Sequence, residues 1–146
     1  MTLRIAAILA LGIGLGLSWN TWSGRGIPLG RSVFAEAGES LISAAEAKRR
    51  LDEGALFLDA RPRAFWEMNH IPGALALPED DFEESFTELE SEIRRRFEVI
   101  VYCSGYGCEA SHIVGRKLRE RGVPASVLDE GLPAWEDAGY PLEEGS

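Results

Sequence analysis

Apolar residues divide the chain into two parts with different patterns. In the first part, no charged residue occurs between Arg4 and Arg25, and the strongly apolar run 5–19 reads IAAILALGIGLGLSW. A helix of about 20 residues spans about 30 Å, which is the hydrocarbon thickness of a bilayer. The run is apolar all round and lacks an amphipathic period, so a buried helix of a soluble domain is the less favoured alternative.

Beyond residue 40, short apolar runs alternate with helical patterns. Four runs are predicted strands, at residues 55–60, 74–77, 99–103 and 125–129. Helices are predicted at residues 43–53, 80–97, 109–121 and 133–138. In the second of these helices, apolar residues recur every three or four positions, which predicts one buried face made of Phe82, Phe86, Leu89, Ile93 and Phe97. Short buried strands separated by helices are typical of an α/β fold with a mainly parallel sheet covered on both faces.

The N-terminal segment has two interpretations. A cleaved signal peptide needs small residues soon after the apolar run, but the first good pattern, at 35–37, lies far downstream and beyond two arginines. We therefore expect residues 1–24 to form a single-pass transmembrane signal anchor, with a signal peptide as the alternative. The membrane partner is then the segment 5–24. Residues 25–39 form a linker, and residues 40–146 form the folded domain, which we expect on the non-cytoplasmic side.

Charge is distributed as unevenly as hydrophobicity. The formal net charge is −9, and all 24 acidic residues lie at Glu36 or later. Three of the 15 basic residues precede Glu36, which leaves the remainder of the chain with a net charge of −12. Such an acidic domain repels nucleic acid and anionic headgroups, so we expect no nucleic-acid partner.

The residues that could bind a metal are few: Cys103, Cys108, His70 and His112. None of them occurs in a C-x-x-C or H-x-x-x-H spacing, so we expect neither a metal site nor a cofactor. Two cysteines are also too few for the disulfide framework of a small secreted domain.

Both cysteines lie in the stretch CSGYGCEAS, residues 103–111. Cys103 ends the predicted strand 99–103 and is followed by a glycine-containing loop and then a helix. Sites in parallel sheets form at the carboxyl ends of the strands, and a helix N-terminus favours a thiolate over a thiol. We therefore predict that Cys103 is a reactive, catalytic thiol, with a buried core cysteine as the alternative.

Three groups of residues resemble, in order and at compatible spacing, the motifs of the rhodanese-like (sulfurtransferase) domain family. They are Leu58-Asp59-Ala60-Arg61 with Phe65 and His70-Ile71-Pro72-Gly73-Ala74, then VIVYC (99–103), then Asp129-Glu130-Gly131 with Trp135 and Ala138-Gly139-Tyr140-Pro141. The resemblance covers roughly residues 40–144. It implies a five-stranded parallel sheet flanked by helices. It also implies a sulfurtransferase whose Cys103 takes sulfane sulfur as a persulfide from a small donor and passes it to a thiol or other nucleophilic acceptor.

Several motif residues also have structural interpretations, namely Asp59, Arg61, His70, Pro72, Gly73, Gly131 and Trp135. The carboxylate and the guanidinium are expected to pair and to tie the first predicted strand to a neighbouring loop. His70 is expected to make a structural hydrogen bond within a turn, with a catalytic base as the alternative. Trp135 is expected in the core.

The loop after Cys103 departs from the family pattern C-x-x-G-x-R-S, because it is two residues longer and lacks the arginine. The predicted active-site loop consists of Ser104, Gly105, Tyr106, Gly107, Cys108, Glu109, Ala110 and Ser111. Glu109 would repel an anionic donor, so thiosulfate:cyanide activity does not follow from the resemblance. Glu109 also stands where a dual-specificity phosphatase needs its arginine, which excludes phosphatase activity.

Cys108 is a candidate resolving thiol. It could attack a persulfide on Cys103 and leave a disulfide, provided that the loop brings the two Cα atoms within about 7 Å. An inert second thiol is the alternative. The sequence thus predicts a membrane-anchored sulfurtransferase first. A thiol–disulfide redox module of the two cysteines and a non-catalytic binding module with the same fold are the alternatives.

Overall fold

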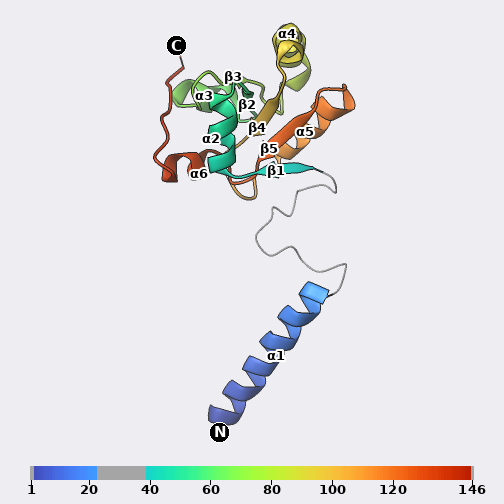
Figure 1. Cartoon of the computed structure of the whole chain (residues 1–146), viewed down its shortest axis with the longest axis vertical. Helices are drawn as coiled ribbons and strands as arrows, with labels where there is room; N and C mark the ends of the chain where they lie inside the picture. The colour runs from blue at the N-terminus through green and yellow to red at the C-terminus, as the bar shows by residue number, and fades with distance from the viewer. Residues whose placement is uncertain (1, 23–38, 146) are drawn as a thin grey trace. The chain divides into compact units, whose positions relative to one another are not determined.

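The computed structural model describes residues 2–22 and 39–145 (Figure 1). The chain divides into two compact units, Met1–Arg31 and Ser32–Ser146. The described part of the first unit is one helix, α1 (Thr2–Trp22). Within the described part of the chain, no helix is both long enough and apolar enough to cross a membrane. The predicted transmembrane anchor therefore has no support from the structure, and most of the predicted linker lies outside the described residues.

The second unit is built on a five-stranded sheet in which every neighbouring pair is parallel, as predicted. The strand order is β1-β5-β4-β2-β3, which places β4 at the centre. The strands are β1 (Ser40–Ile42), β2 (Leu56–Asp59), β3 (Leu75–Ala76), β4 (Val99–Tyr102) and β5 (Ala125–Leu128). Four of them coincide with the predicted apolar runs. β1 was not predicted from the pattern, because only one of its three residues is buried.

Helices cover both faces of the sheet. They are α2 (Ala44–Asp52), α3 (Arg63–Met68), α4 (Phe82–Arg95), α5 (Ala110–Glu120) and α6 (Gly131–Asp137). Successive side chains of a strand point to opposite faces, so Leu56 and Leu58 lie in one core cluster and Phe57 lies in the other. The first cluster also contains residues of α4 and α5, and the second contains residues of α2 and α6.

One prediction for α4 is wrong. Phe82, Phe86 and Ile93 are buried, as the amphipathic period predicts, but the Phe97 side chain is fully exposed. The helix ends at Arg95, and Arg96 takes an extended backbone with φ −86° and ψ 141°. The helical period therefore stops before Phe97, and its ring is no longer directed at the core.

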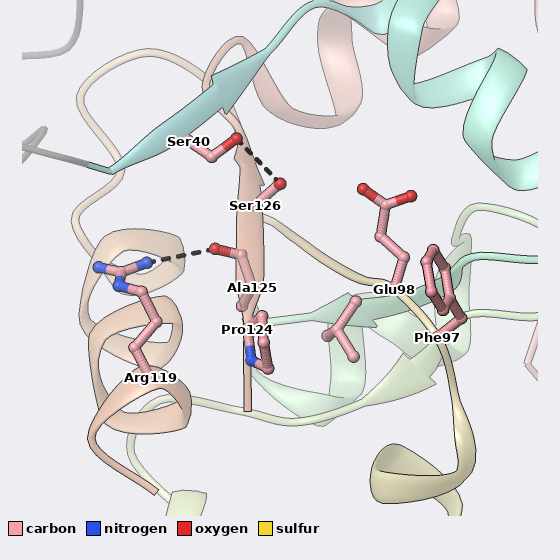
Figure 2. Close-up of a pocket in the computed structure, with 8 residues that line it drawn as sticks. Ser40, Phe97, Glu98, Arg119, Pro124, Ala125 and Ser126 are labelled. Atoms are coloured by element: carbon pink, nitrogen blue, oxygen red, sulfur yellow. Dashed lines mark hydrogen bonds between the residues drawn. The ribbon is translucent and has the colours of Figure 1, made fainter. Parts of the chain in front are cut away.

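Phe97 borders a hollow of about 320 Å³ at the amino ends of the strands (Figure 2). The first residues of three strands, Ser40, Val99 and Ala125, line it, and the Ser126 hydroxyl is 3.1 Å from that of Ser40. Sites of parallel sheets form at the opposite, carboxyl ends. This hollow therefore lies at the other end of the sheet from the cysteines.

Candidate active site

Cys103 lies in the middle of the carboxyl edge of the sheet. It follows β4 directly, and all four residues of this strand are buried. β4 pairs with β5 on one side and β2 on the other. Cys103 itself is only 3% exposed. The apolar, β-branched sequence of β4 therefore places this sulfur at the point of a parallel sheet where reactive groups gather.

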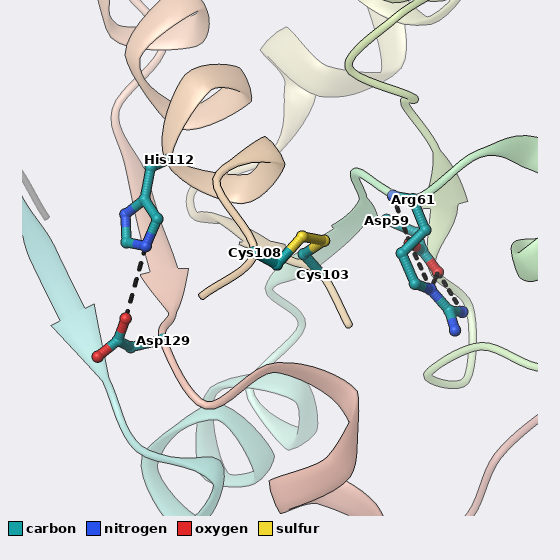
Figure 3. Close-up of a disulfide and its surroundings, with 6 residues drawn as sticks. All are labelled: Asp59, Arg61, Cys103, Cys108, His112 and Asp129. Carbon is teal, nitrogen blue, oxygen red and sulfur yellow. Dashed lines mark hydrogen bonds and ion pairs between the residues drawn. A yellow bond between two sulfur atoms is a disulfide. The ribbon is translucent and has the colours of Figure 1, made fainter. Parts of the chain in front are cut away.

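Cys103 forms a disulfide with Cys108 (Figure 3). The two Cα atoms are 6.2 Å apart, inside the range of about 4.4–6.8 Å that disulfides accept. A tight turn between them makes this distance short. The Cys108 amide donates to the Gly105 carbonyl at 3.0 Å, and Gly105 has φ 120°, a conformation that residues with a side chain rarely adopt.

The loop is fastened to the start of α6. The Leu132 amide donates to the Cys103 carbonyl at 2.9 Å. Gly131 packs so closely that a Cβ atom on it would lie 2.4 Å from both the Cys103 carbonyl oxygen and the Gly105 nitrogen. Gly131 also has φ 62°. Only glycine fits at this position. The shape of the loop therefore explains why the motif has glycine at residue 131.

A second fastening joins two exposed parts of the site. The Tyr106 hydroxyl donates to Glu130 Oε1 at 2.5 Å, although the tyrosine side chain is 63% exposed. The hydrogen bond to this carboxylate raises the pKa of Tyr106 to about 12. The phenol is therefore protonated at neutral pH and acts as the donor.

The loop leads directly into α5, whose first residue, Ala110, comes two positions after Cys108. Glu109 occupies the N-cap position, and its exposed side chain makes no capping hydrogen bond. No lysine or arginine occurs between Cys103 and Ser111. The rim around the disulfide therefore carries the carboxylates of Glu109 and Glu130 but no basic residue of its own loop.

A buried cluster around His112 was missed by the sequence argument, which considered this residue only as a metal ligand. His112 is 2% exposed, its Nδ1 is 2.7 Å from Glu39 Oε2, and its Nε2 is 3.5 Å from Asp129 Oδ1 (Figure 3). Arg119 Nη2 donates to Glu39 Oε1 at 3.2 Å. The cluster joins the residue before β1, helix α5 and the end of β5. No local pattern could have found it, because the sheet brings these distant residues together.

Asp59 and Arg61 form a buried ion pair at the carboxyl end of β2, with Arg61 Nη2 at 2.7 Å from Asp59 Oδ2. The same nitrogen donates to the Asn69 carbonyl at 2.5 Å, which ties the strand end to the following loop. Burial disfavours the charge of Arg61, but the hydrogen bonds and charge of Asp59, together with Tyr102, outweigh burial and raise the pKa of the guanidinium. Figure 3 shows that the Asp59 and Arg61 side chains point toward each other and not toward the disulfide.

The other motif residues have partners of a structural kind. His70 Nδ1 is 2.9 Å from the Trp66 carbonyl, and its ring stacks on Trp66 with centroids 4.4 Å apart. Gly73, which follows Pro72, donates its amide to a Glu143 carboxylate oxygen at 2.9 Å. Trp135 is fully buried, and its Nε1 donates to the Pro141 carbonyl at 2.8 Å. The contacts with Glu143 and Pro141 hold the C-terminal segment against the domain.

Comparison with known proteins gives consistent results. A family model for the rhodanese-like domain matches residues 43–138. The chain is 32% identical over 109 residues to the HTH-type transcriptional regulator Rv0324 of Mycobacterium tuberculosis. This alignment covers 74% of this chain and 46% of the regulator. The solved rhodanese-like domain of the Alr3790 protein from Anabaena sp. has a TM-score of 0.60 at 31% identity, covering 73% of this chain and 80% of that domain.

An enzyme is also similar. Thiosulfate sulfurtransferase from Pseudomonas aeruginosa has a TM-score of 0.59 at 26% identity, covering 74% of this chain and 21% of the enzyme. The chain spans less than half the length of the curated relatives it matches first.

Proposed function

Because this chain belongs to the rhodanese-like domain family, we propose that it is a sulfurtransferase that carries sulfane sulfur as a persulfide on Cys103. One observation carries the proposal. Cys103 is a buried sulfur at the carboxyl end of the central strand, in a loop that leads directly into the N-terminus of α5. The helix dipole and the unpaired amides of such a terminus favour a thiolate, which is the nucleophilic form of cysteine.

In the proposed reaction, the reduced Cys103 thiolate attacks the sulfane sulfur of a small donor. The bond between that sulfur and the donor breaks, and the donor leaves with the electron pair. An acceptor thiolate then attacks the outer sulfur of the persulfide and releases the Cys103 thiolate. Each transfer is a two-electron displacement at sulfur and needs no cofactor.

The disulfide favours a second candidate route that uses Cys108. With its Cα 6.2 Å from that of Cys103, the Cys108 thiolate can attack the inner sulfur of the persulfide. Hydrosulfide then leaves with the electron pair, and the Cys103–Cys108 disulfide forms. Two electrons from a reductant restore the two thiols, so this route joins sulfur transfer to thiol–disulfide exchange.

The similarity to a thiosulfate sulfurtransferase supports the reaction class but not that donor. Thiosulfate is a dianion, and the rim of the site carries Glu109 and Glu130 without a basic residue in the loop. We therefore propose a donor with less negative charge beside its sulfane sulfur than thiosulfate, such as a hydropersulfide RSSH, since carboxylates near a site repel anions.

The location outside the cytoplasm remains our proposal. Disulfides persist in oxidising compartments and are rare in the cytosol, which agrees with the Cys103–Cys108 bond. Attachment to a membrane remains a prediction from the apolar sequence. Fractionation of cells that express the full chain tests the location and the membrane attachment. The protein should be recovered with a non-cytoplasmic fraction.

The function is tested by incubating the reduced full chain with sulfane-sulfur donors, including glutathione persulfide and thiosulfate. We expect a mass increase of one sulfur atom, mapped to Cys103. The Cys103→Ser variant should take up none, and circular dichroism should show that it is folded. If no donor places sulfur on Cys103 of the folded wild-type chain, the proposed function is wrong.

A further inference from the structure

We propose that the Cys103–Cys108 disulfide is opened by a thiol that enters at Cys108, and that the acidic rim of Glu109 and Glu130 selects thiols without a negative charge. The proposal concerns the reductant of the site. It rests on the proposed function only for the statement that the released Cys103 is the sulfur carrier.

The two halves of the disulfide differ in access. Cys103 is 3% exposed, and its carbonyl is bound by the Leu132 amide at the start of α6. Cys108 is partly exposed and follows Tyr106 and Gly107, which are both exposed. Thiol–disulfide exchange requires an approach to one sulfur, and the accessible sulfur is attacked first. The incoming thiol should therefore bond to Cys108.

The electrons balance in two steps. An incoming thiolate attacks Cys108 Sγ, the disulfide breaks, and the electron pair leaves on Cys103 Sγ. A second thiolate then attacks the bound reductant at its own sulfur and releases the Cys108 thiolate together with the oxidised reductant. Two thiols thus supply the two electrons, and Cys103 is the first sulfur to become free.

The charge of the rim acts on the first of these steps. Glu109 is exposed and is the next residue after Cys108. Glu130 precedes Gly131, which packs against the loop, and its carboxylate accepts a hydrogen bond from the Tyr106 hydroxyl at 2.5 Å. Across the sheet edge, the charge of Arg61 is already paired with Asp59. A thiol that carries a carboxylate therefore approaches against two like charges, whereas an ammonium group is attracted.

Three small thiols of similar size test this selection: 2-aminoethanethiol, 2-mercaptoethanol and 3-mercaptopropionate. The opening of the disulfide in the oxidised full chain is followed at low ionic strength. Each rate is expressed per concentration of thiolate and divided by the rate of the same thiolate with a small uncharged disulfide, which removes the difference in intrinsic nucleophilicity. We expect the cationic thiol to react fastest and the anionic thiol slowest. Each carboxylate of the rim should contribute a factor on the order of two to five to the ratio between these two rates. High salt should bring the three rates together.

Two variants locate the effect. Glu109→Gln should narrow the ratio between the cationic and anionic thiols by about two- to fivefold. Glu88→Gln, the same change at an exposed position of α4, should leave the ratio unchanged. Equal relative rates for the three thiols after this correction, or an unchanged ratio in Glu109→Gln, would overturn the selection by the rim.

The point of entry is read from the same reaction. Acid quenching soon after mixing, alkylation of free thiols and peptide mapping should find the label on Cys103 and the incoming thiol on Cys108. The opposite distribution refutes entry at Cys108. These results do not depend on persulfide uptake, so failure of the sulfurtransferase proposal and failure of this one are told apart.

Discussion

Gly131 offers the sharpest test of how the active loop is held. Replacing it by alanine adds one methyl group at a position with φ 62°. That methyl carbon would lie 2.4 Å from the Cys103 carbonyl oxygen and 2.7 Å from the Gly105 Cα. The atoms it meets belong to the backbone of the active loop, so they cannot turn away as a side chain would.

Two costs add in this variant. A non-glycine residue in the left-handed region costs about 1–2 kcal/mol. Overpacking that forces the backbone to shift costs about 1–3 kcal/mol more. We therefore expect Gly131→Ala to lower the free energy of unfolding by about 2–5 kcal/mol, a large fraction of the 5–15 kcal/mol that is typical of a domain.

Gly122→Ala is the matched control. Gly122 has φ 75°, and an added Cβ would meet no atom within 4 Å. It should lose only the conformational part, about 1–2 kcal/mol. Urea unfolding of the oxidised full chain measures both variants. In addition, only Gly131→Ala should slow the formation of the persulfide on Cys103, because only its methyl group displaces the loop. If both variants are equally stable and equally reactive, the tight contact between α6 and the loop is not what holds the site.

Three further outcomes follow from the structure. Asp59→Ala leaves the Arg61 guanidinium buried without its carboxylate and should lower the free energy of unfolding by about 3–5 kcal/mol in urea titrations, whereas the double variant that also carries Arg61→Ala should lose less than the sum of the two single variants. Because the pKa of Tyr106 is raised from 10.0 to about 12, its contribution to stability is complete below pH 10 and is lost as the pH rises toward 12. Unfolding midpoints in this pH window should therefore fall more steeply for the wild type than for Tyr106→Phe, and identical slopes would contradict the hydrogen bond. Cys108→Ser cannot form the disulfide, so persulfide should accumulate on Cys103 and sulfide release should slow, while an unchanged rate of sulfide release would make Cys108 a bystander.

Sequence patterns predicted those parts of the fold that are locally encoded. Four strands were found because each is a short apolar run, and Cys103 was placed correctly because strand, loop and helix follow one another in the chain. β1 was not found because Ile42 is its only buried residue. α3 was not found because it has six residues and none is buried.

The finer features of the site depend on contacts between distant residues. The spacing of Cys103 and Cys108 in the sequence could not decide whether they form a disulfide. Their Cα separation depends on the turn at Gly105 and on the contact with α6. The cluster of Glu39, His112 and Asp129 joins three elements that only the sheet brings together. The exposure of Phe97 has a local cause instead, since α4 ends at Arg95 although the apolar period of the sequence continues to residue 97.

The contacts of Glu39 also bear on where the folding unit ends. The match to the rhodanese-like family model begins at residue 43 and ends at residue 138. A fragment cut at those limits would lose β1, and it would remove the Glu39 carboxylate from buried His112 and from Arg119. It would also lose the Pro141 carbonyl that binds the Trp135 indole. The packed domain of this protein is therefore longer than the family-model match, and it extends from Glu39 to the C-terminal segment that binds Trp135.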